Sequence, residues 1–231
     1  MHRNTIPTVS VLMTVFNTPF YLVKRAIDSV LIQDNQSFEL LVLDDGSHPD
    51  SSLLLEQYCQ INQAKIRYTR HPNCGQSQSI NRGVLASRGT YITVIDSDDE
   101  YKPNHLSACL SEMCHADLIS SFTETIVSSA DDHYVPDKYD NQKTIHVDEC
   151  TLFATLFGKR EVFETLAFKS MYSADSEFYA RASMQYPTKK VDLRTYIYYR
   201  NNAHSITASL KKEHTINPQN VAVPYEAPCE N

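Results

Sequence analysis

Two regular patterns of hydrophobic and polar positions alternate along the first half of the chain. Short apolar runs rich in β-branched residues, typical of strands buried on both faces, cover residues 9–15, 38–43, 65–69 and 91–95. Segments with apolar side chains at helical spacing follow them, at residues 17–33, 50–63, 76–87 and 103–114. This alternation predicts an α/β fold with a mostly parallel, doubly wound sheet flanked by helices.

The pattern is less regular after residue 117. We expect a strand at 118–126, a surface excursion or hairpin at 128–148, helices near 149–157, 160–167 and 175–186, and a strand at 191–199. Residues 211–231 contain three prolines and are expected to form an extended C-terminal tail.

Composition narrows the class of protein. The formal net charge is −7 and the basic residues are scattered, which argues against a nucleic-acid-binding surface. No apolar run reaches the ~18 residues that a membrane-spanning helix needs. We therefore expect a cytoplasmic chain, free or associated peripherally with the inner face of the membrane. The six cysteines form no CxxC pair, so reduced thiols are expected.

A cluster of carboxylates follows the fourth predicted strand. Asp96, Ser97 and Asp98 come directly after the strand and lead into Asp99 and Glu100. Ligands of parallel α/β sheets bind at the carboxyl ends of the strands, and clustered carboxylates favour a hard divalent cation such as Mn²⁺ or Mg²⁺. We expect Asp98 to contact the metal directly, and Asp96 to reach a ribose or a metal-bound water.

Further motifs surround this cluster in a fixed order between residues 8 and 106. They are the first strand ending at Asn17, the helical segment 26–33, the turn 43–47, the loop and helix start 73–83, and residues 86–92. Together they resemble the family 2 glycosyltransferases, whose nucleotide-binding half has the GT-A fold. The resemblance implies one domain over residues 6–210, with a nucleotide-binding part at 6–116 and an acceptor part at 117–210.

The resemblance also implies a binding site for a nucleotide sugar. Asp45, with Asp44 as the alternative, would accept a hydrogen bond from N3 of uracil, since a carboxylate only accepts and N3 donates. The other residues placed in this site by the resemblance are Thr14 and Val15 at the base pocket, Asn17, Asn81 and Arg82 facing the diphosphate, Asp96 and Ser97.

The acceptor half resembles the family less closely. Asp175 aligns with the carboxylate that deprotonates the acceptor hydroxyl, and Glu177 is a second candidate because Ala174 replaces a common acid. A positioned carboxylate can act as this general base. His204 is a candidate third metal ligand or phosphate contact, and Arg200 a candidate phosphate contact.

The leading hypothesis is therefore an inverting, metal-dependent glycosyltransferase that moves a sugar from a UDP-sugar to a hydroxyl of a glycan or lipid-linked acceptor in surface polysaccharide biosynthesis. A nucleotidyltransferase is an alternative, but the segment after the first strand lacks the glycine- and lysine-rich loop that it needs. A non-catalytic or auxiliary nucleotide-sugar-binding domain of a larger polymerase is a further alternative.

Overall fold

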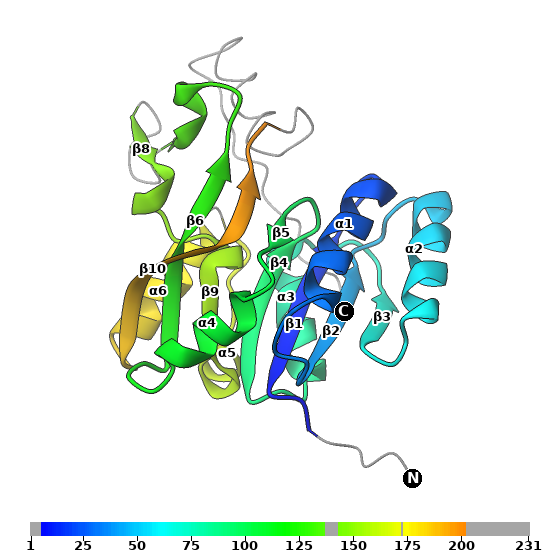
Figure 1. Ribbon diagram of the computed structural model, residues 1–231, viewed down its shortest axis with the longest axis horizontal. Helices are drawn as coiled ribbons and strands as arrows, with labels where there is room; N and C mark the ends of the chain where they lie inside the picture. Colours follow the sequence, from blue (N-terminus) through cyan, green and yellow to red (C-terminus); the bar gives the residue numbers. More distant parts are fainter. Residues whose placement is uncertain (1–5, 137–142, 172, 202–231) are drawn as a thin grey trace.

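The computed structural model describes residues 6–136, 143–171 and 173–201 of the chain (Figure 1). Its first half confirms the predicted alternation of strands and helices. The elements are β1 Val9–Val15, α1 Phe20–Leu31, β2 Phe38–Asp44, α2 Pro49–Ile61, β3 Ile66–Arg70, α3 Gln76–Ala86, β4 Tyr91–Asp96 and α4 His105–Glu112. A two-residue strand, β5 Glu100–Tyr101, was not expected from the sequence.

The second half adds strands to the same sheet. Its elements are β6 Leu118–Ile126, β7 Tyr134–Pro136, β8 Thr144–His146, β9 Leu156–Lys159, α5 Arg160–Leu166, α6 Ala174–Ser183 and β10 Thr188–Tyr199, with 3₁₀ turns at Ala130–His133, Val147–Glu149 and Phe153–Thr155. Strands β7 and β8 pair antiparallel, which confirms the hairpin predicted within residues 128–148.

The main sheet has the order β3-β2-β1-β4-β9-β6-β10-β5. Strands β3, β2, β1 and β4 pair with one another in parallel. Strand β9 is antiparallel to both β4 and β6, and β10 is parallel to β6. Strands β4 and β6 therefore run in the same direction. As a result, the carboxyl ends of β1, β2, β4, β6 and β10 lie at one edge of the sheet, where ligands of such folds bind.

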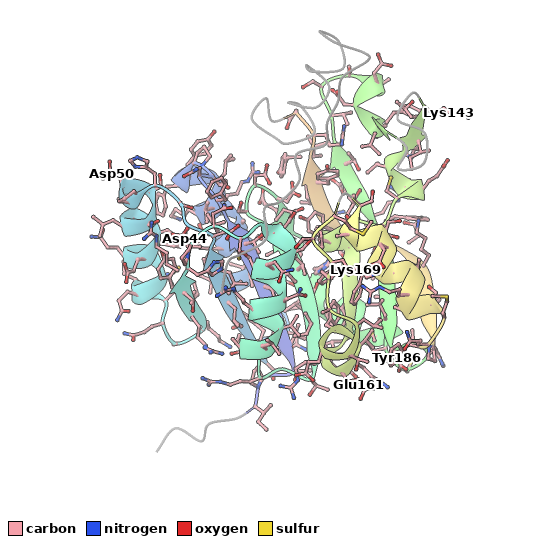
Figure 2. The ribbon with its side chains drawn as sticks, turned by 180° about the vertical axis from the view of Figure 1, so that it is seen from behind. Asp44, Asp50, Lys143, Glu161, Lys169 and Tyr186 are labelled. Atoms are coloured by element: carbon pink, nitrogen blue, oxygen red, sulfur yellow. The ribbon has the colours of Figure 1, made fainter. Side chains whose placement is uncertain are left out.

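Helices cover both faces of the sheet. Helices α3, α5 and α6 lie together on the face seen in Figure 2, and α1, α2 and α4 lie on the opposite face, toward the viewer of Figure 1. Side chains of β1 alternate between two core clusters: Val11 and Met13 belong to the cluster with α1, and Leu12 to the cluster with α3. This burial on both faces explains the continuous apolar runs in the sequence.

The helix predicted near residues 149–157 is wrong. The segment forms two 3₁₀ turns and then β9, which lies between β4 and β6. Phe157 packs into one core cluster and Leu156 into the other, so the run is apolar on both faces. Periodicity cannot distinguish such a short buried strand from a helix. Gly158 is needed there, because a Cβ would lie 2.8 Å from the Asp117 carbonyl oxygen.

Candidate active site

The acidic turn lies between β4 and β5 at the binding edge of the sheet. Asp96 ends β4, and its Oδ1 accepts a hydrogen bond from Gln76 Nε2 at 2.9 Å. The Ser97 hydroxyl lies 2.7 Å from that of Thr18. The backbone carbonyl of Asp98 accepts a hydrogen bond from Arg25 on α1. Side chains from α1 and α3 thus hold the turn from two sides.

Negative charge accumulates around Asp96. Burial, the nearby charge of Asp98 and the charge of Asp175 raise the pKa of the Asp96 carboxyl to about 7, although Gln76 opposes this shift. Burial and the charges of Asp96 and Asp98 likewise raise the pKa of Asp99. A divalent cation bound among these oxygens would relieve the repulsion. The oxygen donors of Asp96 and Asp98 therefore fit Mn²⁺ or Mg²⁺.

Asp175 reaches this cluster from the acceptor half of the chain. It lies in the first turn of α6, which begins at Ala174 after Ser173, so Asp175 is not the N-cap of the helix. Its charge acts on Asp96, although 79 residues separate the two in sequence. The fold therefore brings the candidate base within electrostatic range of Asp96 in the candidate metal site.

Glu177 has a different environment on the same helix. Its carboxylate accepts hydrogen bonds from Arg181 Nε at 2.8 and 2.9 Å and from Lys169 Nζ at 2.5 Å. Burial acts to raise the pKa of Glu177, but these cationic partners outweigh it and leave the pKa lowered. A carboxylate held in this way is a poor proton acceptor, which argues against Glu177 as the general base.

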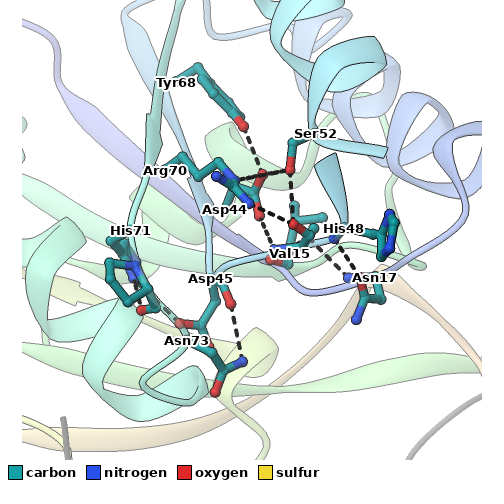
Figure 3. A network of polar contacts seen from close by, with 12 residues as sticks. Val15, Asn17, Asp44, Asp45, His48, Ser52, Tyr68, Arg70, His71 and Asn73 are labelled. Atoms are coloured by element: carbon teal, nitrogen blue, oxygen red, sulfur yellow. Dashed lines mark hydrogen bonds and ion pairs between the residues drawn. The ribbon is translucent and has the colours of Figure 1, made fainter. Parts of the chain in front are cut away.

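The two carboxylates at the end of β2, Asp44 and Asp45, point into different networks (Figure 3). Asp44 is fully buried, and its oxygens accept hydrogen bonds from the backbone N–H of Ser47, the hydroxyl of Ser52 and the hydroxyl of Tyr68. Burial acts to raise its pKa, but these donors leave the pKa lowered. Asp44 therefore fixes the start of α2.

Asp45 faces the loop before α3. Its Oδ1 accepts from the N–H of Cys74 at 2.7 Å and its Oδ2 from that of Gly75 at 2.9 Å. Gly75 and Gly46 both have left-handed φ angles, +82° and +80°, which glycine adopts without strain. The carboxylate has further donors: His71 Nδ1 lies 3.4 Å from Oδ1, and the Ser79 side chain hydrogen-bonds to the same group. A nucleobase that donates to Asp45 would have to share or displace these donors.

The predicted residues of β1 lie beside these carboxylates. Thr14 lies opposite Asp96 on the adjacent strand β4. The Val15 carbonyl accepts a hydrogen bond from the Asp45 N–H at 2.8 Å. Asn17 follows with a left-handed φ of 53°, and its Oδ1 accepts a hydrogen bond from the His48 N–H at 2.8 Å. Asn17 thus ties the end of β1 to the turn after β2.

The structure uses Asn81 differently from its predicted contact with a diphosphate. Its Nδ2 donates to the Phe168 carbonyl and its Oδ1 accepts from the Phe168 N–H, both at 2.8 Å. Both polar atoms of the amide therefore join α3 to the segment before α6. The neighbouring Arg82 is exposed. Arg200 donates to the carbonyl oxygen of Asp132, and His204 lies outside the described residues.

Sequence reasoning missed several residues that shape the acidic turn. Gln76 contacts the Asp96 side chain, and Arg25 contacts the Asp98 carbonyl. Tyr196 contacts both Asp96 and Asp99. These contacts span 20 to 100 positions in sequence, so no local spacing could reveal them. Asp99, expected from the sequence either to support the metal ligands or to be solvated, is buried.

Comparison with known proteins identifies the family of the chain. The profile described as Glycosyl transferase family 2 matches residues 10–167, so the chain belongs to that family, as predicted. An uncharacterized glycosyltransferase of Methanocaldococcus jannaschii is 26% identical over 186 residues, which are 76% of this chain and 64% of that protein. The chain thus spans less than two thirds of this relative's length.

Two solved structures share the fold. TarS residues 1–349 of S. aureus, in complex with UDP-GlcNAc, matches with a TM-score of 0.67 at 19% identity, over 87% of this chain and 60% of that one. The mannosyltransferase PcManGT of Pyrobaculum calidifontis, in complex with GDP-Man and Mn²⁺, matches with a TM-score of 0.66 at 16% identity, over 84% and 57%. These matches confirm the predicted fold class.

Within the described residues, no helix is long and apolar enough to cross a membrane.

Proposed function

We propose that this chain is the catalytic domain of an inverting, metal-dependent glycosyltransferase that uses a UDP-sugar and a hydroxyl acceptor of a glycan or lipid-linked glycan. The observation that carries the proposal is that Asp96 ends β4 at the binding edge of the sheet and that the charge of Asp175, from the other half of the chain, acts on it. A candidate base next to a candidate site for a metal-bound diphosphate is the arrangement that sugar transfer to a hydroxyl requires.

In the proposed reaction, Asp175 takes the proton of the acceptor hydroxyl. The oxygen then attacks the anomeric carbon from the side opposite the diphosphate, and the bond between that carbon and the diphosphate oxygen breaks. One displacement inverts the configuration at the anomeric carbon. Arg82, an exposed residue of α3, is the proposed phosphate contact, since a guanidinium can pair with phosphate.

Asp98 and Asp96 are the proposed ligands of Mn²⁺ or Mg²⁺. The cation would supply charge neutralisation for the departing diphosphate. PcManGT, a protein of the same fold, is described with Mn²⁺ and a nucleotide sugar, which supports this assignment. His204 is retained as a proposed third ligand from outside the described residues.

Uracil is the proposed base because Asp45, an acceptor-only side chain, lies beside Thr14 and Val15 at the end of β1. TarS, described with UDP-GlcNAc, supports this choice. The fold alone does not decide the base, because PcManGT is described with GDP-Man, and guanine also offers N–H donors to a carboxylate.

A donor-hydrolysis screen over UDP-, GDP-, dTDP- and CMP-sugars, each with and without Mn²⁺, tests this proposal. We expect turnover of a UDP-sugar only with Mn²⁺. A preference for GDP or CMP would overturn the Asp45–uracil assignment, and full turnover in a chelator would overturn the metal assignment. UDP-sugar binding without turnover over a panel of acceptors would favour an auxiliary domain of a larger polymerase.

A further inference from the structure

The turn that carries Asp96 and Asp98 requires support from outside itself. It brings like charges together between two strands, and its backbone closes through a single hydrogen bond from the Asp99 N–H to the Asp96 carbonyl at 3.3 Å. Repulsion between carboxylates would spread such a turn unless other elements held it. The support comes from β10, about 100 residues later in the sequence.

One hydroxyl group bridges the two ends of the turn. Tyr196 OH accepts a hydrogen bond from the Asp96 N–H at 3.2 Å and donates one to Asp99 Oδ2 at 2.7 Å. The other oxygen of Asp99 accepts from the backbone N–H of Tyr199 at 2.8 Å. Both carboxylate oxygens of Asp99 are therefore directed toward β10, and the side chain joins the turn to that strand.

The position of Tyr196 is itself fixed by packing. Its side chain is fully buried, and its ring meets those of Tyr101 and His105 edge-on, at centroid distances of 5.7 and 6.4 Å. An irregularity in β10 shifts the pairing with β6 between Val191 and Tyr196, within which Arg194 has a left-handed φ of 47°. Bulges of this kind re-aim side chains next to functional sites.

A second contact holds the middle of the turn. Arg25 on α1 donates to the Asp98 carbonyl at 2.5 Å, and its guanidinium lies 3.9 Å from the ring centroid of Tyr199. The stacked Tyr199 is the residue whose backbone holds Asp99. The backbones of Asp96 and Asp98 are thus each fixed by a side chain from another element.

We propose that Tyr196 and Asp99 act as a positioning pair that holds the Asp96–Asp98 turn in the shape that binds the divalent cation. The pair does not ligate the metal, since both oxygens of Asp99 are directed to β10. Groups that orient metal ligands typically change metal affinity about 10- to 100-fold when they are removed. This inference rests on the proposed metal site.

The test is a titration of the full chain with Mn²⁺ in the presence of UDP. The EPR signal of free Mn²⁺ measures how much of the metal is bound. We expect Tyr196→Phe, which removes only the bridging hydroxyl, to weaken Mn²⁺ binding about 10- to 100-fold. Donor hydrolysis should show the same increase in the Mn²⁺ concentration for half-maximal rate, with kcat recovered at saturating Mn²⁺. Tyr91→Phe, the same change at the opposite end of β4, should bind Mn²⁺ as the wild type does.

Unchanged Mn²⁺ affinity in Tyr196→Phe would overturn the inference even if the melting temperature fell, because a purely structural hydroxyl would affect only stability. If that variant does not fold, Asp99→Asn keeps the side-chain shape and carries the same expectation. Failure of the wild-type chain to bind Mn²⁺ would overturn the proposed metal site and, with it, this inference. Mn²⁺ binding by the wild type with unchanged affinity in Tyr196→Phe would overturn this inference alone.

Discussion

Asp175, in the first turn of α6, lies close enough to Asp96, at the end of β4, for its charge to help raise the Asp96 pKa. The two carboxylates come from different halves of the chain. Since one aligns with a base and the other with a metal-binding motif, their proximity gives a direct test of the proposed chemistry.

Asp175→Asn should lower kcat about 10²- to 10⁴-fold, the usual contribution of a general base. The KM for the donor should change little, because Asp175 is proposed to act on the acceptor. The measurement is steady-state transfer with a purified acceptor.

Glu177→Gln is the matched control for Asp175→Asn on the same helix. It removes the ion pairs with Arg181 and Lys169, so we expect a small loss of stability and near-normal kcat. The reverse result, with kcat lost in Glu177→Gln and kept in Asp175→Asn, would move the base to Glu177.

Asp98→Ala should abolish transfer while the fold survives, because the side chain is proposed as a metal ligand in a turn held by backbone contacts. Transfer assays and circular dichroism together check this expectation. Asp50→Ala, an exposed change at the start of α2, should leave transfer unchanged. Near-wild-type transfer by Asp98→Ala would exclude Asp98 as a required ligand.

Asn81→Ala should destabilise the protein by about 1–3 kcal/mol, because it leaves the N–H and carbonyl of Phe168 without their partner. Urea denaturation measures this change.

The adjacent Arg82→Ala is the control for stability, since Arg82 is exposed, and we expect a change within about 0.5 kcal/mol. Its proposed effect is instead a higher KM for the donor. Equal stability of the two variants would show that the Asn81 contacts contribute nothing net.

His105 makes the fold sensitive to acid. Burial lowers its pKa from 6.5 to about 3, so between these values the unfolded chain binds a proton that the folded protein does not. Above pH 6.5 the ionisation of His105 costs the folded protein no stability. As the pH falls from 6.5 toward 3, protonation of His105 in the unfolded chain lowers the free energy of unfolding. Between pH 7 and pH 5 the loss is about 2 kcal/mol.

His105→Phe keeps a ring against Tyr101 and removes the titrating group. Urea denaturation at both pH values should therefore show a free energy of unfolding that falls about 2 kcal/mol less in the variant than in the wild type. The comparison uses the difference between the two proteins, so other titrating groups cancel. Parallel pH profiles would contradict this assignment.

Much of the nucleotide-binding half could be predicted from the sequence. Runs such as Val9–Val15 and Phe38–Asp44 are buried on both faces, so the apolar pattern and the architecture have the same physical cause. Asp96 and Asp98 were predicted at a ligand-binding edge because they directly follow such a run. The order of short motifs also identified the family, since each motif is local in the sequence.

Only the tertiary structure decided the contacts between distant elements. It made residues 156–159 a strand between β4 and β6, although a helix was expected near residues 149–157. It also decided three hydrogen-bond partners: Asn81 bonds to Phe168, Asp45 to the loop before α3, and Tyr196 to the acidic turn. Local patterns record which side chains are buried, whereas partners separated by up to 100 residues depend on the order and register of the strands that bring them together.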